Sequence, residues 1–327
     1  MLTAVGLLLG MPQVLAQTIT ATAPHGEGAV WVESRYNNIV PGGDDPCNTT
    51  VFHGPEGSSG PLKIDGSATL WGAGSCGMIG ALAVTADGTW LGGAEGIHSN
   101  EAAFEAALFW VSGAKVSGPY WPRVGSTDTS APDAPLYRHY ESRISSVLTQ
   151  DKEVWVVGTF RATQYRNERS GAWLGRLSNG EWVRVREISS VSGQARHQPA
   201  LTAAEGGGVW TVSLVSGAAE VRKFDARGEE VLSFSHPLPA AMASHGSISV
   251  TERTEGVLQV ATMPDWSSAD VHVLQLSVDG LKYGRVAQQS SDKRSGFVAE
   301  GESLWALHGP GRRALKIAWE QPAPEQP

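Results

Sequence analysis

The stretch Ile144-Ser-Ser-Val-Leu-Thr-Gln-Asp-Lys-Glu-Val-Trp-Val-Val-Gly-Thr-Phe160 decides the fold class, because it joins two short apolar segments by a turn. Both segments are rich in β-branched residues, and this composition is typical of strands. Asp151-Lys152 forms a two-residue hairpin loop between them. Ser178-Asn179-Gly180 supplies the next turn, because Asn-Gly tolerates the positive φ that tight turns require. This part of the chain therefore predicts four short strands, at residues 144–150, 153–160, 171–177 and 182–188.

The same strand, centred on an aromatic or large apolar residue, recurs along the chain. Its central residues are Trp31, Trp90, Trp155, Trp210, Leu258 and Trp305, at intervals of 59, 65, 55, 48 and 47 residues. Such intervals are too long for a helical solenoid and close to the roughly 40 to 50 residues of a four-stranded propeller blade. The fifth unit repeats the pattern most clearly, with strands expected at 246–251, 257–263, 271–277 and 282–287. We expect the central strand to be the second strand of each unit and to be buried on both faces.

The sequence thus predicts an all-β protein that forms a single β-propeller of six four-stranded blades. The last unit supplies strands at 296–299, 303–307 and 314–319 and is one strand short, whereas Gln17–Ala23 is an unassigned strand at the other end. Pairing Gln17–Ala23 as the outer strand of the sixth blade would close the ring and remove exposed edges. The alternative is a β-sandwich or β-helix in which the tryptophan spacing is incidental.

One segment carries a resemblance to a known repeat. Val84-Thr-Ala-Asp-Gly-Thr-Trp-Leu-Gly-Gly-Ala-Glu-Gly96 resembles the D-G-x-W-x-G-T-x-x-G repeat of the regulator-propeller family found in sensor ectodomains, and 153–159 matches it more weakly. The resemblance covers one blade and implies a propeller fold and ligand sensing, without a particular ligand. Members of that family often carry more blades and a signalling module, and this chain has neither.

Composition excludes several classes of function. The chain has 327 residues with 39 Gly, 12 Trp and only 18% charged residues, which rules out long helices as the main architecture. Its net charge of −8 argues against a nucleic-acid partner, because neutralising phosphates requires a basic face. Contact with an anionic membrane surface is disfavoured for the same reason.

The two ends of the chain predict export and a short tail. Residues 2–16 form an uncharged apolar run ending in Val14-Leu-Ala16, which is typical of a signal peptide and its cleavage site although no basic residue precedes it. A buried strand or helix is the alternative. The domain boundaries are therefore 1–16 for the signal peptide, 17–320 for the propeller and 321–327 for a disordered Pro-rich tail, with no membrane span elsewhere. We expect a secreted or periplasmic protein.

Cys47 and Cys76 are the two cysteines of the sequence. In an exported chain they predict one disulfide, and both fall in expected loops around one blade. Two buried free thiols or half of a metal site are the alternatives, but a zinc site would need CxxC-type spacing and nearby histidines.

The predicted site lies on the face formed by loops between the second and third strands of a blade and between successive blades. The long loop 125–142 ends in Tyr137, His139 and Tyr140, which could reach over the central channel or pack on its rim. In the loop 161–170, Arg161 and Arg166, with Arg169, could bind a carboxylate, or simply face solvent with Glu168 as a local partner. Trp266 could contact a sugar or peptide, or cap the channel.

Neither a metal nor a cofactor is expected. Histidines at 98, 139, 197, 236, 245 and 308 lie in or beside these loops, but no H-x-H or H-E-x-x-H motif occurs. There is also no P-loop, no nucleophile elbow and no intact S-x-D-x-G-x-x-W box.

The sequence favours a binding propeller that takes a protein or carbohydrate partner through its loop-rich face, as a scaffold, sensor or accessory subunit. The alternative is a polysaccharide hydrolase or lyase with carboxylates at the channel mouth, for which Asp44, Asp133, Glu141 and Asp265 are the candidates. A hydrolase would need these carboxylates to lie close together at the channel mouth, which the sequence does not establish.

Overall fold

The structure is a computed structural model. It describes residues 17–25, 28–35, 49–53, 62–64, 75–97, 103–113, 115–122, 124, 139–164, 167–193, 195, 197–242, 248–262, 270–287, 296–300, 303–308 and 311–319. Within these ranges the chain is almost entirely β-strand, and one short 3-10 helix, η1 (Ala240–Met242), precedes β17.

The strands form six antiparallel sheets in chain order. The first sheet contains β1 (Gln17–His25), β2 (Gly28–Arg35), β3 (Thr49–His53) and β4 (Leu62–Ile64). The second contains β5 (Ser75–Thr85), β6 (Gly88–Ile97), β7 (Ala103–Ser112) and β8 (Lys115–Tyr120). The third contains β9 (His139–Gln150), β10 (Glu153–Gln164), β11 (Asn167–Ser178) and β12 (Glu181–Ser192).

The other three sheets continue the pattern with one change near the end of the chain. The fourth contains β13 (Gln198–Ala203), β14 (Val209–Val215), β15 (Ala218–Phe224) and β16 (Glu230–Pro237). The fifth contains β17 (Ile248–Thr254), β18 (Val257–Thr262), β19 (Asp270–Ser277) and β20 (Gly280–Ala287), extended by β24 (Ala318–Trp319). The sixth contains β21 (Gly296–Glu300), β22 (Ser303–His308) and β23 (Gly311–Leu315).

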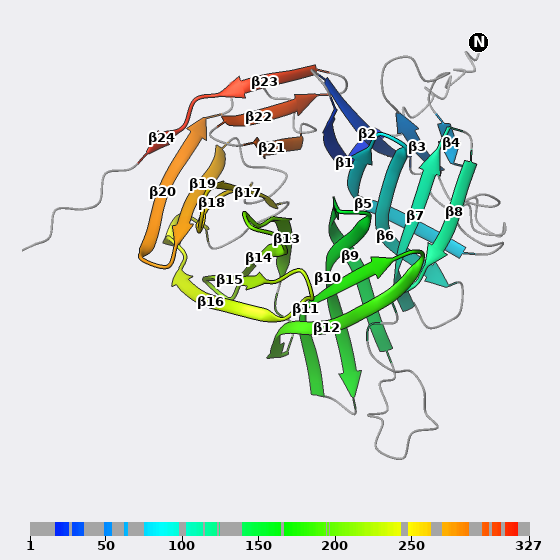
Figure 1. The fold of residues 1–327 in the computed structure, drawn as a ribbon, viewed down its shortest axis with the longest axis horizontal. Coiled ribbons are helices and arrows are strands. Elements are labelled where there is room, and N and C mark those ends of the chain that lie inside the picture. Colours follow the sequence, from blue (N-terminus) through cyan, green and yellow to red (C-terminus); the bar gives the residue numbers. More distant parts are fainter. Residues whose placement is uncertain are drawn as a thin grey trace, which may run out of the picture.

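The sheets are arranged around a centre, with the first strand of each sheet innermost (Figure 1). Contacts run from β1 to β5, β9, β13, β17 and β21, and β21 in turn contacts β1. The sixth sheet therefore packs beside the first. Six sheets in this order are the predicted six-bladed propeller.

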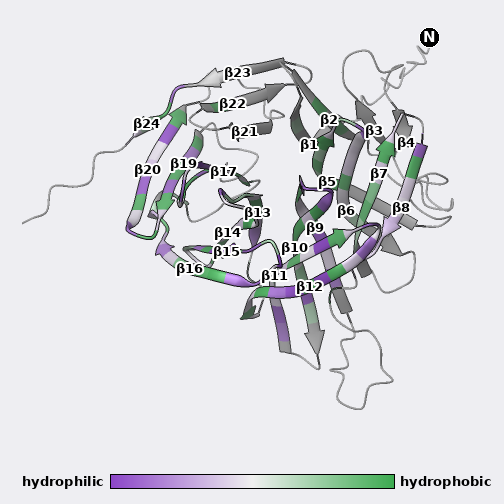
Figure 2. Ribbon diagram, viewed as in Figure 1, coloured by the Kyte–Doolittle hydropathy of each residue, from purple (hydrophilic) through white to green (hydrophobic). Residues whose placement is uncertain are grey.

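Apolar layers between consecutive sheets hold the ring together. Five buried clusters lie between the first and second, second and third, third and fourth, fourth and fifth, and fifth and sixth sheets. Strands that are enclosed on both faces read as continuous apolar runs, and β14 is buried at every residue. Figure 2 shows how hydrophilic and hydrophobic residues alternate along many of the other strands. The second to fifth sheets are therefore each stabilised by a buried apolar cluster on both sides.

The predicted pattern of strands and turns within a blade is confirmed. Trp31, Trp90, Trp155, Trp210, Leu258 and Trp305 all lie on the second strand of their sheets. The hairpin loops are where the turn residues predicted them: Asp151 and Lys152 have φ values of 49° and 68°, and Asn179 and Gly180 have φ values of 52° and 82°. This backbone conformation matches the right-handed twist of the flanking strands.

The predicted closure of the ring by the N-terminal strand is wrong in its pairing. β1 is the first strand of the first sheet, where Gln17 lies opposite Arg35 and His25 opposite Gly28. A strand that precedes its neighbour directly pairs with it at a small loop-closure cost, whereas pairing with the sixth blade spans nearly the whole chain. At the other end β24 pairs with β20, with Gly284 opposite Trp319.

No helix in the described residues is long and apolar enough to cross a membrane. The propeller fold agrees with what the regulator-propeller resemblance implied, but the fold does not distinguish that family from other propellers.

Candidate functional site

One end of the layer between the third and fourth sheets gathers polar side chains. At this end β9 and β11 begin, β10 and β12 end, and the connection from β12 to β13 crosses over. Ser170 on β11 fixes that connection: its Oγ donates to the carbonyl of Gly193 at 2.9 Å and accepts from the amide of Ala195 at 2.9 Å. This is the face on which the sequence predicted a site, because it carries the second-to-third-strand loops.

Arg161 lies on β10 at this end, opposite Glu141 on one side and Ser170 on the other. Its Nη2 donates to Oε1 of Glu168 at 2.9 Å. This hydrogen bond raises the pKa of Arg161, and the charges of Glu168 and Glu141 add to it against the smaller effect of burial. The Nε of Arg161 is buried without a hydrogen-bond partner. Arg161 is thus held in place by Glu168, and its Nε–H stays buried without a partner.

Arg169 does not join Arg161. It lies opposite Ala162, so its side chain projects from the other face of the third sheet. There it pairs with Glu187, and its guanidinium lies 5.5 Å from the ring centre of Phe160. Arg161 and Arg169 therefore lie in different layers, on opposite faces of the third sheet.

His197 lies immediately before β13 and is only 4% exposed. Neither ring nitrogen makes a hydrogen bond of ordinary length and angle, but the backbone of Ser170 lies close enough to the ring to influence its pKa. Burial lowers the pKa of His197, and this effect outweighs the opposing influences of the Glu220 carboxylate and the Ser170 carbonyl. The imidazole is therefore neutral at pH 7, with one nitrogen that donates and one that accepts.

Ser213 on β14 and Glu220 on β15 lie directly opposite one another. They share the face of the fourth sheet that packs Val209 and Phe224 against the third sheet. Ser213 is 4% exposed, and neither its Oγ nor Oε2 of Glu220 has a hydrogen-bond partner. Pro199, opposite Ser213, is two residues after His197, which brings the imidazole near this pair.

We name Arg161, Ser170, His197, Ser213 and Glu220 the polar cluster. Each buried polar atom that lacks a partner costs about 1–3 kcal/mol relative to its hydrated state, and proteins keep few of them. The cluster combines an N–H donor, a neutral imidazole, a hydroxyl and a carboxylate oxygen, all buried without ordinary hydrogen bonds. Within the described residues no group of three or more His, Cys, Asp or Glu side chains is placed to hold a metal ion.

Most of the other predicted site residues lie outside the described residues: Tyr137, Arg166, Trp266 and Cys47, with Asp44, Asp133 and Asp265. His139 and Tyr140 begin β9, opposite Thr163 and Ala162, and Cys76 lies on β5 opposite Gly96, but these three side chains are not described. The Cys47–Cys76 disulfide remains a prediction, which titration of thiols in the denatured protein would test.

Ser213 and Glu220 were not singled out from the sequence, and His197 was only one of six loop histidines. The sequence nevertheless contains a pattern that could have identified Ser213 and Glu220. Ser213 interrupts Val209-Trp-Thr-Val-Ser-Leu-Val215, and Glu220 follows two alanines in a strand whose alternate residues are buried. Polar side chains inside such strands need a partner or a function.

The six sheets around one centre, with their polar cluster at one end, define this chain as a β-propeller. No protein-family model matches the sequence, and no curated protein matches it either.

Solved structures share the fold. A structure of Trypanosoma rangeli sialidase with the inhibitor DANA superimposes with a TM-score of 0.56 at 12% identity, covering 94% of this chain and 55% of that one. A second structure of that sialidase, with 2,3-difluorosialic acid as a covalent intermediate, gives a TM-score of 0.52 at 10% identity, with coverages of 92% and 54%. This chain thus spans about half the length of those sialidase chains. At such identities the likeness shows the fold alone.

Proposed function

We propose that this protein is a carbohydrate-directed hydrolase whose site includes the polar cluster. The observation that carries the proposal is the presence of two carboxylates, Glu141 and Glu220, at the end of the layer where polar atoms lack partners. Hydrolysis of a glycosidic bond commonly uses two carboxyl groups, one as general acid and one as base or nucleophile. The shared fold of a sialidase supports the same class of substrate.

The two carboxylates differ in surroundings, as this chemistry requires. Glu141 lies opposite Arg161 on β10. Glu220 lies opposite buried Ser213 and near neutral His197, and its Oε2 is buried without a hydrogen-bond partner. We infer that Glu141 and Glu220 together form the catalytic pair of carboxyl groups.

The test is hydrolysis of a panel of fluorogenic glycosides and polysaccharides by the full chain. Glu141→Gln and Glu220→Gln should each reduce kcat/KM by at least about 100-fold, because a missing acid or base typically costs that much. Glu187→Gln is the matched control, since Glu187 pairs with Arg169 on the other face of the same sheet and should leave activity near that of the wild type.

The result also separates this proposal from the binding propeller that the sequence favoured. Retention of a glycan with no hydrolysis, unchanged by Glu141→Gln, would leave a carbohydrate-binding protein and remove the enzyme. Neither hydrolysis nor retention of any carbohydrate would overturn both.

A further inference from the structure

The outermost strands of the six sheets differ in how they are protected against pairing with another chain. An outer strand leaves alternate N–H and C=O groups unpaired, and proteins protect such edges by shortness, charge, proline or a covering strand. β4 is three residues long, β8 contains Pro119, and β20 is paired with β24. β12 and β23 carry arginines, at positions 184, 186, 312 and 313. Among the described outer strands, β16 is the exception.

The middle of β16 has none of these protections. Its sequence Val231-Leu-Ser-Phe-Ser-His-Pro237 contains no Asp, Glu, Lys or Arg, and the bulge at Val231 and the proline lie at its two ends. Val231 is 57% exposed and Leu232 is 36% exposed, and Ser233 and Ser235 are exposed as well. Among the described strands, β15 is the one that pairs with β16. Figure 1 shows β16 on the outer rim of the ring.

The register fixes which backbone groups of β16 point away from β15. The amide of Leu238 donates to the carbonyl of Gly217 at 2.7 Å, and these two residues continue the β15–β16 register. Hydrogen-bonded and non-hydrogen-bonded pairs alternate along an antiparallel ladder, so the even-numbered residues of 232–236 bond to β15. Ser233 and Ser235 therefore direct their N–H and C=O groups outward.

These outward groups match those of a second β16 strand. When two copies meet antiparallel about Phe234, Ser233 of one copy lies opposite Ser235 of the other, and each N–H donates to the opposite C=O. The two-fold axis repeats this pair of hydrogen bonds. Val231 and Leu232 lie at the ends of the pairing, where the second copy would cover part of their exposed apolar surface. No like charges oppose each other along this segment, because it contains no Asp, Glu, Lys or Arg.

We propose that this protein self-associates through the outer edge of β16, which pairs antiparallel with β16 of a second copy and joins the two fourth sheets into one. A single pair of short strands buries less than the roughly 1,200 Å² of a standard stable interface, so the dimer dissociates on dilution. The inference goes beyond the proposed function and does not depend on it.

The experiment is sedimentation velocity of the full chain over about a hundredfold range of concentration in the micromolar region. We expect the weight-average sedimentation coefficient to rise with concentration toward that of a dimer. Ser235→Pro removes an outward N–H donor, and proline is tolerated on an edge strand where the N–H faces solvent. Both copies lose the donor, so the dimer should weaken at least about tenfold. Ser235→Ala keeps the amide and is the matched control, which should dimerise like the wild type.

A second variant and a local measurement connect the dimer to this edge. Ser233→Lys places one charge from each copy beside the two-fold axis, so it should also weaken the dimer at least about tenfold. Hydrogen exchange of the Ser233 and Ser235 amides reports on the edge directly. These amides should exchange rapidly in dilute protein and become protected as the concentration rises. Thermal melts verify that each variant is folded, and if Ser235→Pro is not, Ser233→Lys and amide exchange decide.

Each outcome decides the inference. A monomer with rapidly exchanging Ser233 and Ser235 amides at every concentration would overturn it and leave the proposed function standing. A dimer that Ser233→Lys leaves intact, and in which these amides still exchange rapidly, would place the interface elsewhere. A monomer in which the amides are protected at every concentration would mean that another segment of the same chain covers β16, which also contradicts pairing with a second copy.

Discussion

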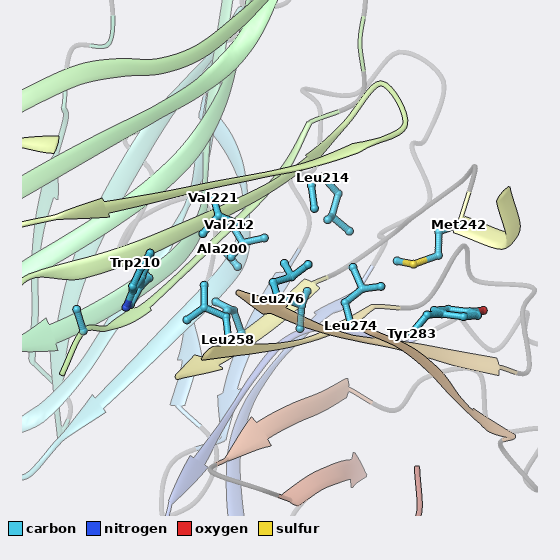
Figure 3. Packing of buried hydrophobic residues seen from close by; sticks show 14 residues of the cluster. Ala200, Trp210, Val212, Leu214, Val221, Met242, Leu258, Leu274, Leu276 and Tyr283 are labelled. Atoms are coloured by element: carbon cyan, nitrogen blue, oxygen red, sulfur yellow. The ribbon is translucent and has the colours of Figure 1, made fainter. Parts of the chain in front are cut away.

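The fourth sheet packs against a neighbouring sheet on each of its faces. The two layers differ in whether their buried polar atoms have hydrogen-bond partners. Toward the fifth sheet, apolar side chains such as Leu214, Leu258 and Leu274 fill the layer, and Met242 from η1 covers one end (Figure 3). The buried polar groups of that layer are paired, as where Nδ1 of His272 lies 2.6 Å from Oη of Tyr283. Toward the third sheet the polar cluster leaves several buried atoms without partners.

The same four strands build both layers, so the fold itself does not demand the polar cluster. Alternate residues of β14 and β15 face the two sides, and the chain could have placed apolar residues at Ser213 and Glu220 as it did at Leu214 and Val221. Buried polar atoms without partners lower the free energy of unfolding. The layer between the third and fourth sheets, which keeps them, is therefore the better candidate for a functional site.

The largest expected effect is in the apolar layer. Leu274→Ala should lower the free energy of unfolding by about 3 kcal/mol, since Leu274 is fully buried and the smaller side chain leaves a cavity. Urea denaturation measures the change. Val278→Ala is the control, because Val278 is 55% exposed and should change stability by less than about 0.5 kcal/mol. A loss below about 1 kcal/mol for Leu274→Ala would contradict the packing of this layer.

The second effect concerns the paired polar group at the other end of the same layer. Oε1 of Glu252 accepts from Nε1 of Trp210 at 2.9 Å and from the amide of Gly256 at 2.8 Å. Glu252→Ala should therefore cost about 1–3 kcal/mol, because it leaves the indole N–H without its partner. Glu252→Gln retains an acceptor oxygen and should cost less. Equal losses for both variants in urea denaturation would mean that the hydrogen bonds are unimportant.

The third effect is a pH dependence that belongs to the polar cluster. The pKa of His197 in the folded state is lower than the ordinary value of 6.5, mainly because the ring is buried. As pH falls through 6.5, the unfolded state therefore takes up protons that the folded state does not, and the free energy of unfolding decreases. The decrease levels off once the pH is below the folded pKa.

Urea denaturation between about pH 5 and pH 8 measures this dependence. His197→Gln cannot be protonated, so its stability should fall less steeply with decreasing pH than that of the wild type. His236→Gln is the control, since His236 instead bonds the carbonyl of Ser277 through Nε2. Identical slopes for His197→Gln and the wild type would contradict a buried neutral imidazole.

The smallest effect compares two buried serines. Ser213→Ala removes a hydroxyl that has no partner, and it should change the free energy of unfolding by less than about 0.5 kcal/mol or raise it slightly. Ser142→Ala should cost about 1 kcal/mol, because Oγ of Ser142 accepts from the amide of Ala106 at 2.9 Å. A loss for Ser213→Ala as large as that for Ser142→Ala would mean that Ser213 is structurally paired.

Local signals in the sequence predicted most of the fold. The tryptophan-centred second strands and the turn residues at Asp151 and Asn179 determine the hairpins, because hairpin register depends on residues only a few positions apart. The pairing of β24 with β20 depends instead on which sheet edges are close in space. No turn motif encodes that information.

The site was less predictable for a related reason. The sequence predicted Arg161 and Arg169 to lie in one loop, but they lie on β10 and β11 and face opposite layers, because strands place alternate residues on opposite sides. His197, Ser213 and Glu220 are spread over three strand beginnings and ends, and only the sheet register brings them together. Proximity in the sequence thus predicted a cluster of arginines, whereas the structure brings together one arginine, two serines, a histidine and a glutamate.

The pairing of β24 with β20 has a consequence for how the ring can open. The chain leaves the fifth sheet after β20, builds the sixth sheet and returns to the fifth, where Arg285 lies opposite Ala318. The sixth sheet is therefore joined to the fifth twice, first by the chain that follows β20 and then by the pairing of β24 with β20. Among the described residues, β21 contacts β1 and β23 contacts β2, but no strand of the sixth sheet pairs with a strand of the first. Within the described strands this junction is the one between sheets that are not consecutive in the chain, and we expect separation of the ring to begin there, on the side away from the third and fourth sheets.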